Sequence, residues 1–398
     1  MLHSYSVSNF RSFKDRVHVS FLLNEKDSVL GWARTSPRSG YRLSTALAVL
    51  GANASGKTSL LQPLAFIGWF VRSSFSAQPD AGIAIKPHFS SQDSPSEFEL
   101  VCDGIEGDEL FRYTLSATRT EVIFESLERK VRRGAWQSIF TRAKSEPGKY
   151  RVTQSNFGLD DKQAENLRPN VSLISWAAQF GVPLALQICD FTLLSNVNAW
   201  GRIWTNASQA LEKSTKLYAE NEVMRARMKE LLGKWDLGLS DIMIEEFKSA
   251  TENGDTNKTW LPIAVHLDKN QNKHLLGFYE ESSGTQAAYT LLTLVLPVLQ
   301  FGGVLVFDEL DADLHPHLLE PMLALFSNEE SNPHGAQIIF TCHAPEVLRF
   351  LQKSQIVLTE KDETDSHAWR LDELEGVRIE DNRIAKYLAG AYGAVPRL

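Results

Sequence analysis

The run from Gly51 to Thr58 is the part of the sequence with the clearest chemistry. It reads Gly-Ala-Asn-Ala-Ser-Gly-Lys-Thr and fits the spacing G-x-x-x-x-G-K-[ST]. A short apolar run precedes it and a helical pattern follows it, so it would join a strand end to a helix start. At such a junction, backbone N–H groups and the helix dipole attract phosphates, the lysine reaches the β and γ phosphates of a nucleotide, and the threonine hydroxyl ligates Mg²⁺. The run therefore predicts an ATP and Mg²⁺ site. The alternative is a glycine-rich helix entry with a solvated lysine.

A second motif combines a buried strand with two acids. Val304–Phe307 is wholly apolar, which is typical of a strand buried on both faces, and Asp308 and Glu309 follow it. Asp308 is predicted to hold the magnesium ion together with Thr58, and Glu309 to polarise an attacking water. Two solvated acids at a strand end are the alternative, which the phosphate loop disfavours.

Two further segments extend this pattern. Residues 281–286 read Glu-Ser-Ser-Gly-Thr-Gln and open a helix, where a hydroxyl and free N–H groups can meet an anion. Gln337–Thr341 predicts a buried strand with His343 just beyond it. A histidine there can hydrogen-bond a γ-phosphate and the attacking water, although alone it would be read as a satisfied strand-end histidine. The order of these motifs predicts an ATPase whose catalytic residues are Lys57, Glu309 and His343.

The predicted ATP contacts include an arginine far from the phosphate loop. Arg11 lies in the turn Asn9-Phe-Arg-Ser-Phe13 and is predicted to contact the nucleotide near its phosphates or base; the alternative is a surface arginine. The complete predicted ATP-binding set is Arg11, Gly51, Asn53, Ala54, Ser55, Gly56, Lys57, Thr58 and Ser59.

The elements that must position these residues predict an α/β fold with a mixed sheet, flanking helices and an antiparallel β lobe. Short strands separated by turns fill much of 97–151, whereas the next hundred residues look helical. The predicted helices there are Asn170–Val182, Leu184–Asn196, Ala207–Trp235 and Asp241–Phe247. We therefore expect three parts: 1–156 as the first half of the head with its β lobe, 157–250 as a helical insertion, and 251–398 as the second half of the head.

Composition narrows the class of protein. The chain has 398 residues and a net charge of −8, which argues against a globally basic nucleic-acid coat. Its 3 cysteines are far apart and fit neither a disulfide framework nor a zinc site, so a reducing cytoplasm is expected. The apolar stretch 287–307 is cut by proline and glycine, which predicts a buried helix up to about Gln300 and then a strand, and no membrane partner.

Three weaker features of the sequence each have a simpler explanation. Residues 129–151 are rich in lysine and arginine around Trp136, which could track a phosphate backbone but more often marks the solvated face of a hairpin. The run Asp311-Ala-Asp313 is similar to a nuclease DxD motif, but too few residues follow His343 for a nuclease domain. His315-Pro-His317 is better explained by a loop entering a helix than by a metal pair.

The order of the motifs resembles the ABC-type ATPases, and the turn 9–13 resembles the start of the SMC, RecF and OLD branch. The chain is similar, nearly over its full length, to the stand-alone AAA/ABC ATPases of bacterial anti-phage systems, of the RloA and AbiL type, with AriA and PtuA as relatives. The residues that carry this are 281–286, the run Asp-Glu-Leu-Asp-Ala-Asp-Leu-His-Pro at 308–316, and the ending Tyr387 to Pro396. Thr285 replaces the usual second glycine, and Ala391 stands where arginine is frequent.

The resemblance implies roles for further residues. It implies a signature loop that completes the ATP site of a partner, formed by Ser282, Ser283, Gly284, Thr285 and Gln286, and a D-loop that contains Asp311 and Asp313. A loop that serves no role in its own site makes sense in a partner's, so a homodimer, or a higher even-numbered oligomer, with ATP between two heads is expected.

Two classes of function compete. The first is an ATP-driven sensor and scaffold of a phage-defence, abortive-infection system, which controls an effector protein (a nuclease or toxin) from the same operon. The second is a DNA-repair ATPase of the RecF or SMC kind that acts directly on DNA, with residues 129–151 as its nucleic-acid contact. An ABC transporter subunit is disfavoured, because the long insertion between phosphate loop and signature does not suit it.

Overall fold

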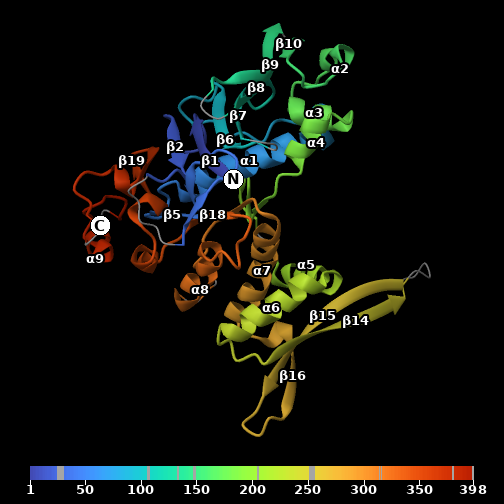
Figure 1. Cartoon of the computed structure of the whole chain (residues 1–398), viewed down its shortest axis with the longest axis vertical. Coiled ribbons are helices and arrows are strands. Elements are labelled where there is room, and N and C mark those ends of the chain that lie inside the picture. Colours follow the sequence, from blue (N-terminus) through green and yellow to red (C-terminus); the bar gives the residue numbers. More distant parts are fainter. Residues whose placement is uncertain are drawn as a thin grey trace.

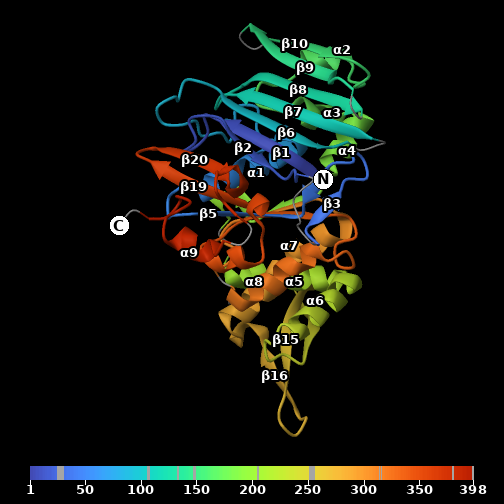
Figure 2. The same cartoon turned by 60° about the vertical axis from the view of Figure 1, so that its left-hand side comes forward.

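The computed structural model describes residues 1–24, 31–104, 108–131, 134–146, 149–203, 206–250, 256–312, 314, 316–378 and 381–396. A large antiparallel sheet lies at one end, a mainly parallel sheet lies in the middle, and helices with a projecting β arm form the other end (Figures 1 and 2). The fold is thus α/β with a mixed sheet, flanking helices and an antiparallel sheet, as predicted.

The central sheet positions the predicted motifs. Its order is β11-β17-β18-β5-β19-β20, and these strands span, in that order, Leu193–Ser195, Val304–Phe307, Gln337–Thr341, Ala46–Gly51, Ile356–Asp362 and Asp365–Arg370. The neighbours from β11 to β19 pair in parallel, and β20 is antiparallel to β19. Parallel pairing brings the carboxyl ends of β5, β17 and β18 to one edge of the sheet. The phosphate loop and the acidic pair both follow strands at that edge.

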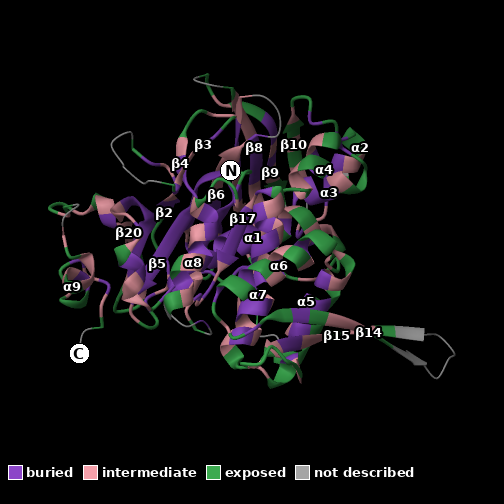
Figure 3. Cartoon of the chain, turned by 60° about the horizontal axis from the view of Figure 1, so that its bottom comes forward, coloured by how far each residue is buried: buried purple, intermediate pink, exposed green. Residues whose placement is uncertain are grey.

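Helices cover both faces of this sheet. α1 (Lys57–Ser73) packs on one face, while α7 (Ser283–Phe301) and α8 (Pro316–Ser327) pack on the other. Alternate residues of β5 therefore enter two different cores, which Figure 3 shows as buried strands between helices. The predicted buried helix and following strand are α7 and β17. Among the described residues, no helix combines the length and apolar character that crossing a bilayer requires.

The antiparallel sheet has the order β10-β9-β8-β7-β6-β1-β2. These strands span, in that order, Lys149–Gln154, Gln137–Glu146, Val122–Val131, Glu109–Ala117, Ser96–Asp103, Leu2–Ser8 and Val17–Ser20. α3 (Leu173–Gln179) and α4 (Pro183–Cys189) pack beside α1, and α2 (Asp161–Glu165) lies by β10. The sheet shares its core with α1, so the antiparallel lobe supports the helix that follows the phosphate loop.

The far end of the molecule combines two helices with a three-stranded sheet. α5 (Ala207–Glu220) and α6 (Glu222–Lys234) pack on α7, and β14 (Asp241–Ala250), β15 (Thr256–Leu267) and β16 (Lys273–Gly277) project from them as an arm (Figures 1 and 2). The smaller elements are β3 (Ala33–Thr35), β4 (Arg42–Ser44), β12 (Val197–Asn198), β13 (Gly201–Arg202) and α9 (Arg383–Leu388).

Four predicted helices differ from the structure. The helix predicted at Asp241–Phe247 is wrong, because this run is β14 and pairs with β15 along its whole length. The helix predicted over Leu184–Asn196 ends at Cys189, and the chain then forms β11, the edge strand of the central sheet. Asn170–Val182 is helical only at α3. Ala207–Trp235 is two helices, because Asn221 has extended angles and its side chain caps α6. Pairing with distant strands decided the first two cases.

A buried ion pair ties the antiparallel sheet to the segment before α3. Arg142 on β9 and Glu125 on β8 have fully buried side chains whose Nη1 and Oε2 atoms are 3.4 Å apart. Both also meet neutral partners: the guanidinium donates to the carbonyl oxygens of Val171 and Arg168, and the carboxylate accepts from Tyr113, Ser172 and the backbone of Leu173. The pair is thus largely satisfied, and removing one member would leave a buried charge.

We predict that Arg142→Met lowers the free energy of unfolding by about 3–5 kcal/mol, because Glu125 would stay buried without its cation. Urea denaturation monitored by circular dichroism measures the change. Lys149→Met is the matched control, since its pair with Glu146 is largely exposed and should contribute at most about 1 kcal/mol. Equal effects of the two substitutions would contradict this account of the lobe.

Candidate functional site

The phosphate loop joins β5 to α1, where the sequence predicts it. A Cβ on Gly51 would lie 2.3 Å from the carbonyl oxygen of Thr359, so the position has no room for a side chain. Gly56 has φ of +107°, and a Cβ there would lie 2.6 Å from Ser366 Oγ. As the N-cap of α1, Gly56 also has no side chain to occupy the N–H groups of the first helical turn. Those groups can therefore serve an anion.

Lys57 lies on this loop. Its Nζ donates hydrogen bonds of 2.9 Å to the carbonyl oxygens of Gly51 and Ala52. Burial lowers the pKa of Lys57, while Asp308 and Glu309 act in the opposite direction. The lysine therefore meets neutral carbonyl groups at a helix start, and phosphate oxygens would be stronger acceptors for it.

The other members of the predicted ATP-binding set have different environments. Asn53 and Ala54 are exposed at the tip of the loop, and Ala54 has φ of +63°. Ser55 is buried, and its hydroxyl lies 2.7 Å from that of Thr359 on β19. Ser59 is partly buried in the first turn of α1. Ser55 thus anchors the loop to the sheet, whereas the tip faces solvent.

Asp308 is the point at which four segments meet. Its Oδ2 accepts a hydrogen bond of 2.9 Å from Thr58 on α1, and its Oδ1 accepts one of 2.6 Å from Thr341 on β18. The side chain of Asn196, which follows β11, holds the Asp308 backbone: it donates to the carbonyl oxygen at 2.9 Å and accepts from the N–H at 2.7 Å. The carboxylate is therefore fixed in direction and position.

The oxygen atoms of Thr58 and Asp308 fit a magnesium ion. A hydroxyl and a carboxylate are hard donors, and the 2.9 Å between Thr58 Oγ1 and Asp308 Oδ2 brings them to one point. In the part of the chain that the structure describes, no group of three His, Cys, Asp or Glu side chains forms a metal cluster. Mg²⁺ often takes one or two protein oxygens and completes its shell with water and phosphate. The residues present therefore fit an ion that binds together with a phosphate ligand.

Glu309 directly follows in a positive-φ conformation of +54°. Its N–H donates a hydrogen bond of 2.6 Å to Thr341 Oγ1, the hydroxyl that also holds Asp308. Its carboxylate accepts a hydrogen bond from Arg202 Nη1 on β13. The Glu309 side chain is 38% exposed, so water can reach the carboxylate. This position suits a general base.

Asp311 and His343 meet through the backbone. Asp311 Oδ2 accepts hydrogen bonds of 2.9 Å from the N–H groups of His343 and Ala344 and so fixes the turn after β18. His343 is exposed, and no hydrogen bond of its ring to the described residues is seen. The structure brings His343 to the same sheet edge as Glu309. Asp313, the second predicted D-loop acid, lies outside the described residues.

The predicted signature loop forms the start of α7. Ser282 is the N-cap: its Oγ accepts from the N–H of Thr285 at 3.2 Å and lies 2.8 Å from the Thr285 hydroxyl. Thr285 is buried, so the residue that replaces glycine takes part in the cap. Gln286 Nε2 donates to the carbonyl oxygen of Glu281 at 2.9 Å. Ser283 is exposed and Gly284 partly buried, which leaves this helix start accessible.

The signature loop lies away from the phosphate loop of its own chain. α7 runs from the central sheet into the end that carries the β arm, and the loop lies at that end (Figure 1). Within the described residues, no hydrogen bond or ion pair joins residues 282–286 to residues 51–59. The structure therefore does not bring these two predicted motifs together in one chain.

Arg11 lies beside the phosphate loop but contacts a hairpin. Its guanidinium donates to the carbonyl oxygen of Ala199 and lies 5.9 Å from the ring centroid of Trp200. Its φ is +57°, and its N–H donates to the carbonyl oxygen of Lys86 at 2.8 Å. Burial lowers the pKa of this guanidinium. The adjacent Ser12 Oγ would be 3.1 Å from a Cβ on Gly56, which places the 9–13 turn against the phosphate loop.

Sequence reasoning missed two residues of the site, Asn196 and Arg202, and the role of a third, Thr341. The sequence predicts Thr341 as the last residue of a strand. It does not predict the hydrogen bonds of the Thr341 hydroxyl with Asp308 and Glu309. Asn196 was assigned to a helix, although it follows a strand parallel to β17. Arg202 had no motif around it. Each acts through a residue more than 30 positions away, so spacing alone carried no signal.

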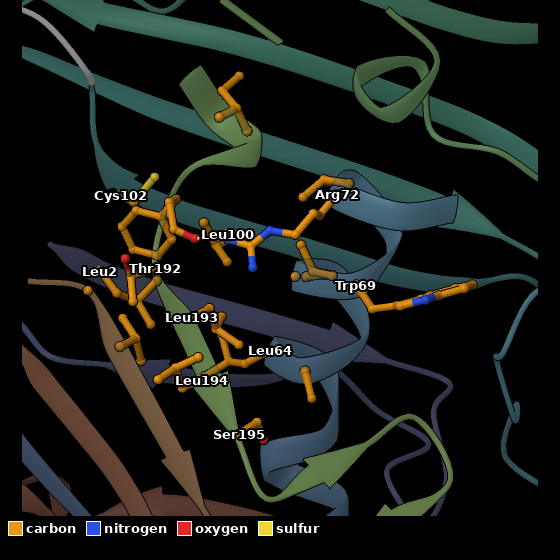
Figure 4. A pocket seen from close by; sticks show the side chains of 18 of the residues that line it. Leu2, Leu64, Trp69, Arg72, Leu100, Cys102, Thr192, Leu193, Leu194 and Ser195 are labelled. Carbon is orange, nitrogen blue, oxygen red and sulfur yellow. Dashed lines mark hydrogen bonds between the residues drawn. The ribbon is translucent and has the colours of Figure 1, made fainter. Parts of the chain in front are cut away.

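A large cavity lies beside α1 but outside this cluster. It has a volume of about 1120 Å³ and lies between α1, β11 and the antiparallel sheet. Figure 4 shows Leu64, Trp69 and Arg72 of α1 across from Leu193 and Leu194. Neither the phosphate-loop lysine nor the acidic pair lines it, and its lining is mainly apolar. The cavity is therefore separate from the phosphate loop and the acidic pair.

Comparisons with solved structures found chains of similar length. An Smc head bound to the C-terminal winged-helix domain of ScpA is 13% identical, with a TM-score of 0.47 and coverage of 94% of this chain and 98% of that one. The SMC head domain from Thermotoga maritima is 14% identical, with a TM-score of 0.42 and coverage of 93% and 98%. RecF with ATP is 12% identical, with a TM-score of 0.35 and coverage of 86% and 92%. None of the curated proteins compared matches the chain.

A family model matches residues 47–349, which hold the phosphate loop, the signature loop, the acidic pair and His343. Its description is "AAA domain, putative AbiEii toxin, Type IV TA system". The match covers well over half of the chain and includes the residues around Asp308. The chain therefore belongs to this AAA-domain family.

Proposed function

We propose that this protein binds and hydrolyses ATP and uses the cycle as a switch in a phage-defence system. The observation that carries the ATPase assignment is the Asp308 cluster. One carboxylate meets the phosphate-loop threonine at 2.9 Å and the β18 threonine at 2.6 Å, and Glu309 is the next residue. Phosphate binding, metal binding and water activation are thereby concentrated at one sheet edge.

Each residue has a defined task in this proposal. The Gly51–Gly56 backbone and the first turn of α1 surround the phosphates, and Lys57 exchanges its two carbonyl partners for phosphate oxygens. Thr58 and Asp308 would hold Mg²⁺, which supplies charge neutralisation at the β and γ phosphates. Glu309 accepts a proton from water as that water attacks the γ-phosphorus and the bridging oxygen leaves with ADP. Asp311 holds His343 near the γ-phosphate through the backbone.

We expect Lys57→Ala to weaken ATP binding by about a hundredfold or more, because the loop loses its only side-chain cation.

Glu309→Gln should keep ATP binding and reduce kcat by about 10²–10³-fold, because positioning survives and water activation does not. Isothermal titration and phosphate release measure the two effects.

The controls are substitutions of the same kind on exposed residues. Lys162→Ala on α2 and Glu330→Gln after α8 should leave binding and turnover unchanged. Normal ATP affinity in Lys57→Ala would refute the nucleotide site. Normal turnover in Glu309→Gln would leave the site intact and assign the base to another residue.

We further propose that two chains share the ATP sites. The support is the position of the signature loop: it is a capped, accessible helix start at the end of α7 away from its own phosphate loop. Ser283 and Gly284 would then approach the γ-phosphate held by Lys57 of a second copy. A two-fold interface of this kind forms with ATP and separates after hydrolysis.

Mixing two inactive variants tests this arrangement. Lys57→Ala destroys the phosphate loop and Ser283→Arg blocks the signature loop, so a mixed dimer would contain one intact composite site. We expect the mixture to regain about a quarter to a half of wild-type ATPase activity, with each variant alone inactive. Absence of recovery in mixed dimers demonstrated by mass spectrometry would show that each head works alone.

The biological role is proposed from the family to which the chain belongs. Among the described residues, no group of three His, Cys, Asp or Glu side chains could hold a metal ion. The family description mentions a toxin and a toxin–antitoxin system. We therefore propose that hydrolysis controls an effector protein, a nuclease or toxin, that the same operon encodes. The β arm and α5–α6 are not needed for ATP chemistry and are the proposed docking surfaces.

The direct-DNA alternative has less support in the structure. In the basic run 129–151, Arg142 is buried, and other cations pair with acids on neighbouring strands. Those pairs are Arg129–Glu109, Lys144–Glu121 and Lys149–Glu146. Arg132 and Arg133 lie outside the described residues. A nucleic-acid contact at this run stays a prediction, with fewer unpaired cations than the sequence suggested.

Phage protection provides the cellular test. We expect the chain alone to be harmless and to protect cells only together with a neighbouring gene, and we expect Lys57→Ala and Glu309→Gln to abolish protection. Plaque counts with and without the neighbour measure this. Protection that survives deletion of the neighbour would contradict the effector proposal, and ATPase activity stimulated by DNA would favour the RecF-like function.

A further inference from the structure

The ion pair between Arg202 and Glu309 has no role in the ATPase scheme above. Arg202 Nη1 donates to Glu309 Oε2, and the two side chains are 17% and 38% exposed. A carboxylate that accepts a hydrogen bond from a guanidinium is held in one direction, and that oxygen is occupied. In this structure, the proposed general base is therefore engaged by a cation.

The backbone that carries Arg202 is fixed on the site. Gln62 on α1 donates to the carbonyl oxygen of Ala199 at 3.2 Å, and Arg11 donates to the same oxygen. Within the β12–β13 turn, Asn198 Oδ1 accepts from the N–H groups of Trp200 at 2.8 Å and Gly201 at 3.2 Å. The hairpin is therefore tied to α1 and to the 9–13 turn, which holds the backbone of Arg202 in place beside the site.

The charges around the Arg202–Glu309 pair indicate which kind of ligand would separate it. Asp308, Glu309 and Asp311 lie close enough to Lys57 to raise its pKa against the effect of burial. Lys57 itself meets carbonyl oxygens, and Arg202 meets Glu309. A terminal phosphate beside Glu309 would repel that carboxylate and attract the guanidinium, since both charges act at short range in a partly buried site.

We propose that Arg202 is a positioning residue that holds Glu309 before ATP binds and moves to the γ-phosphate when ATP binds. The exchange frees the Glu309 carboxylate to take the proton of the attacking water. ADP lacks the γ-phosphate and leaves the pair intact. The inference rests on the proposed ATPase function. It explains why the Glu309 carboxylate becomes available as a base only when ATP is bound.

A double-mutant cycle on nucleotide affinity tests the exchange. The four proteins are wild type, Arg202→Ala, Glu309→Gln and the double variant, titrated with a non-hydrolysable imido analogue of ATP and with ADP, each with Mg²⁺. If Arg202 leaves Glu309, the wild type loses an ion pair on binding the analogue and Glu309→Gln does not. Glu309→Gln should then tighten analogue binding about five- to thirtyfold more when Arg202 is present than when it is alanine. With ADP, Glu309→Gln should change the affinity by the same factor whether or not Arg202 is present.

The opposite sign refutes the exchange. If Arg202 stayed on Glu309, it would screen the carboxylate, and Glu309→Gln would tighten analogue binding less with Arg202 present than without it. Equal loss of analogue and ADP affinity in Arg202→Ala would also refute it, since that pattern marks a residue that only supports the pocket. Failure of the wild type to bind either nucleotide would instead refute the proposed function, and this inference with it.

Further variants separate the exchange from a folding defect. Arg227→Ala is the matched control, because Arg227 also pairs with a glutamate but lies on α6, away from the site. Arg202→Lys retains the charge and should recover part of the coupling, whereas Arg202→Gln should not. The Tm of each variant shows whether it is folded, and Arg202→Gln replaces Arg202→Ala in the cycle if alanine unfolds the hairpin.

Discussion

The position of the Asp308 carboxylate is the constraint on which the rest of the site depends. Its two oxygens accept hydrogen bonds from Thr58 and Thr341, and Asn196 holds its backbone from both sides. Those partners follow or belong to α1, β18 and β11. The cluster can form only if β11, β17, β18 and β5 pair in parallel with their carboxyl ends aligned, because parallel pairing in register is what brings these chain ends together.

The helices packed on the two faces of the central sheet support this alignment of the strand ends. α1 must begin directly at the phosphate loop, and its apolar face is covered by the antiparallel sheet, so that lobe stabilises the helix without contributing a residue to the acidic cluster. On the other face, α7 connects the central sheet to the signature loop. α7 thus links the central sheet directly to the end of the molecule that carries the β arm, which agrees with the proposed role of ATP as a switch.

Two arginine–glutamate ion pairs have different roles in this structure. Arg142 and Glu125 are buried where hydrogen bonds satisfy them, and they stabilise the antiparallel lobe. Arg202 and Glu309 are partly exposed beside the phosphate loop, where a ligand can compete for either partner. Side chains of the same chemical types thus form a structural pair in one place and an exchangeable pair in the other, because burial and access to a competing anion differ.

The sequence by itself determined the parts that depend on local order. The loop Gly51–Thr58, the buried strand before Asp308 and the helix start at Ser282 could be predicted because their residues are contiguous and their conformations follow from glycine, apolar runs and capping. Only the tertiary structure decided that Asp241–Phe247 is a strand, that β11 joins the central sheet, and that Arg202 meets Glu309. These outcomes depend on partners more than ten positions away, and a local pattern contains no information about a partner that the fold supplies.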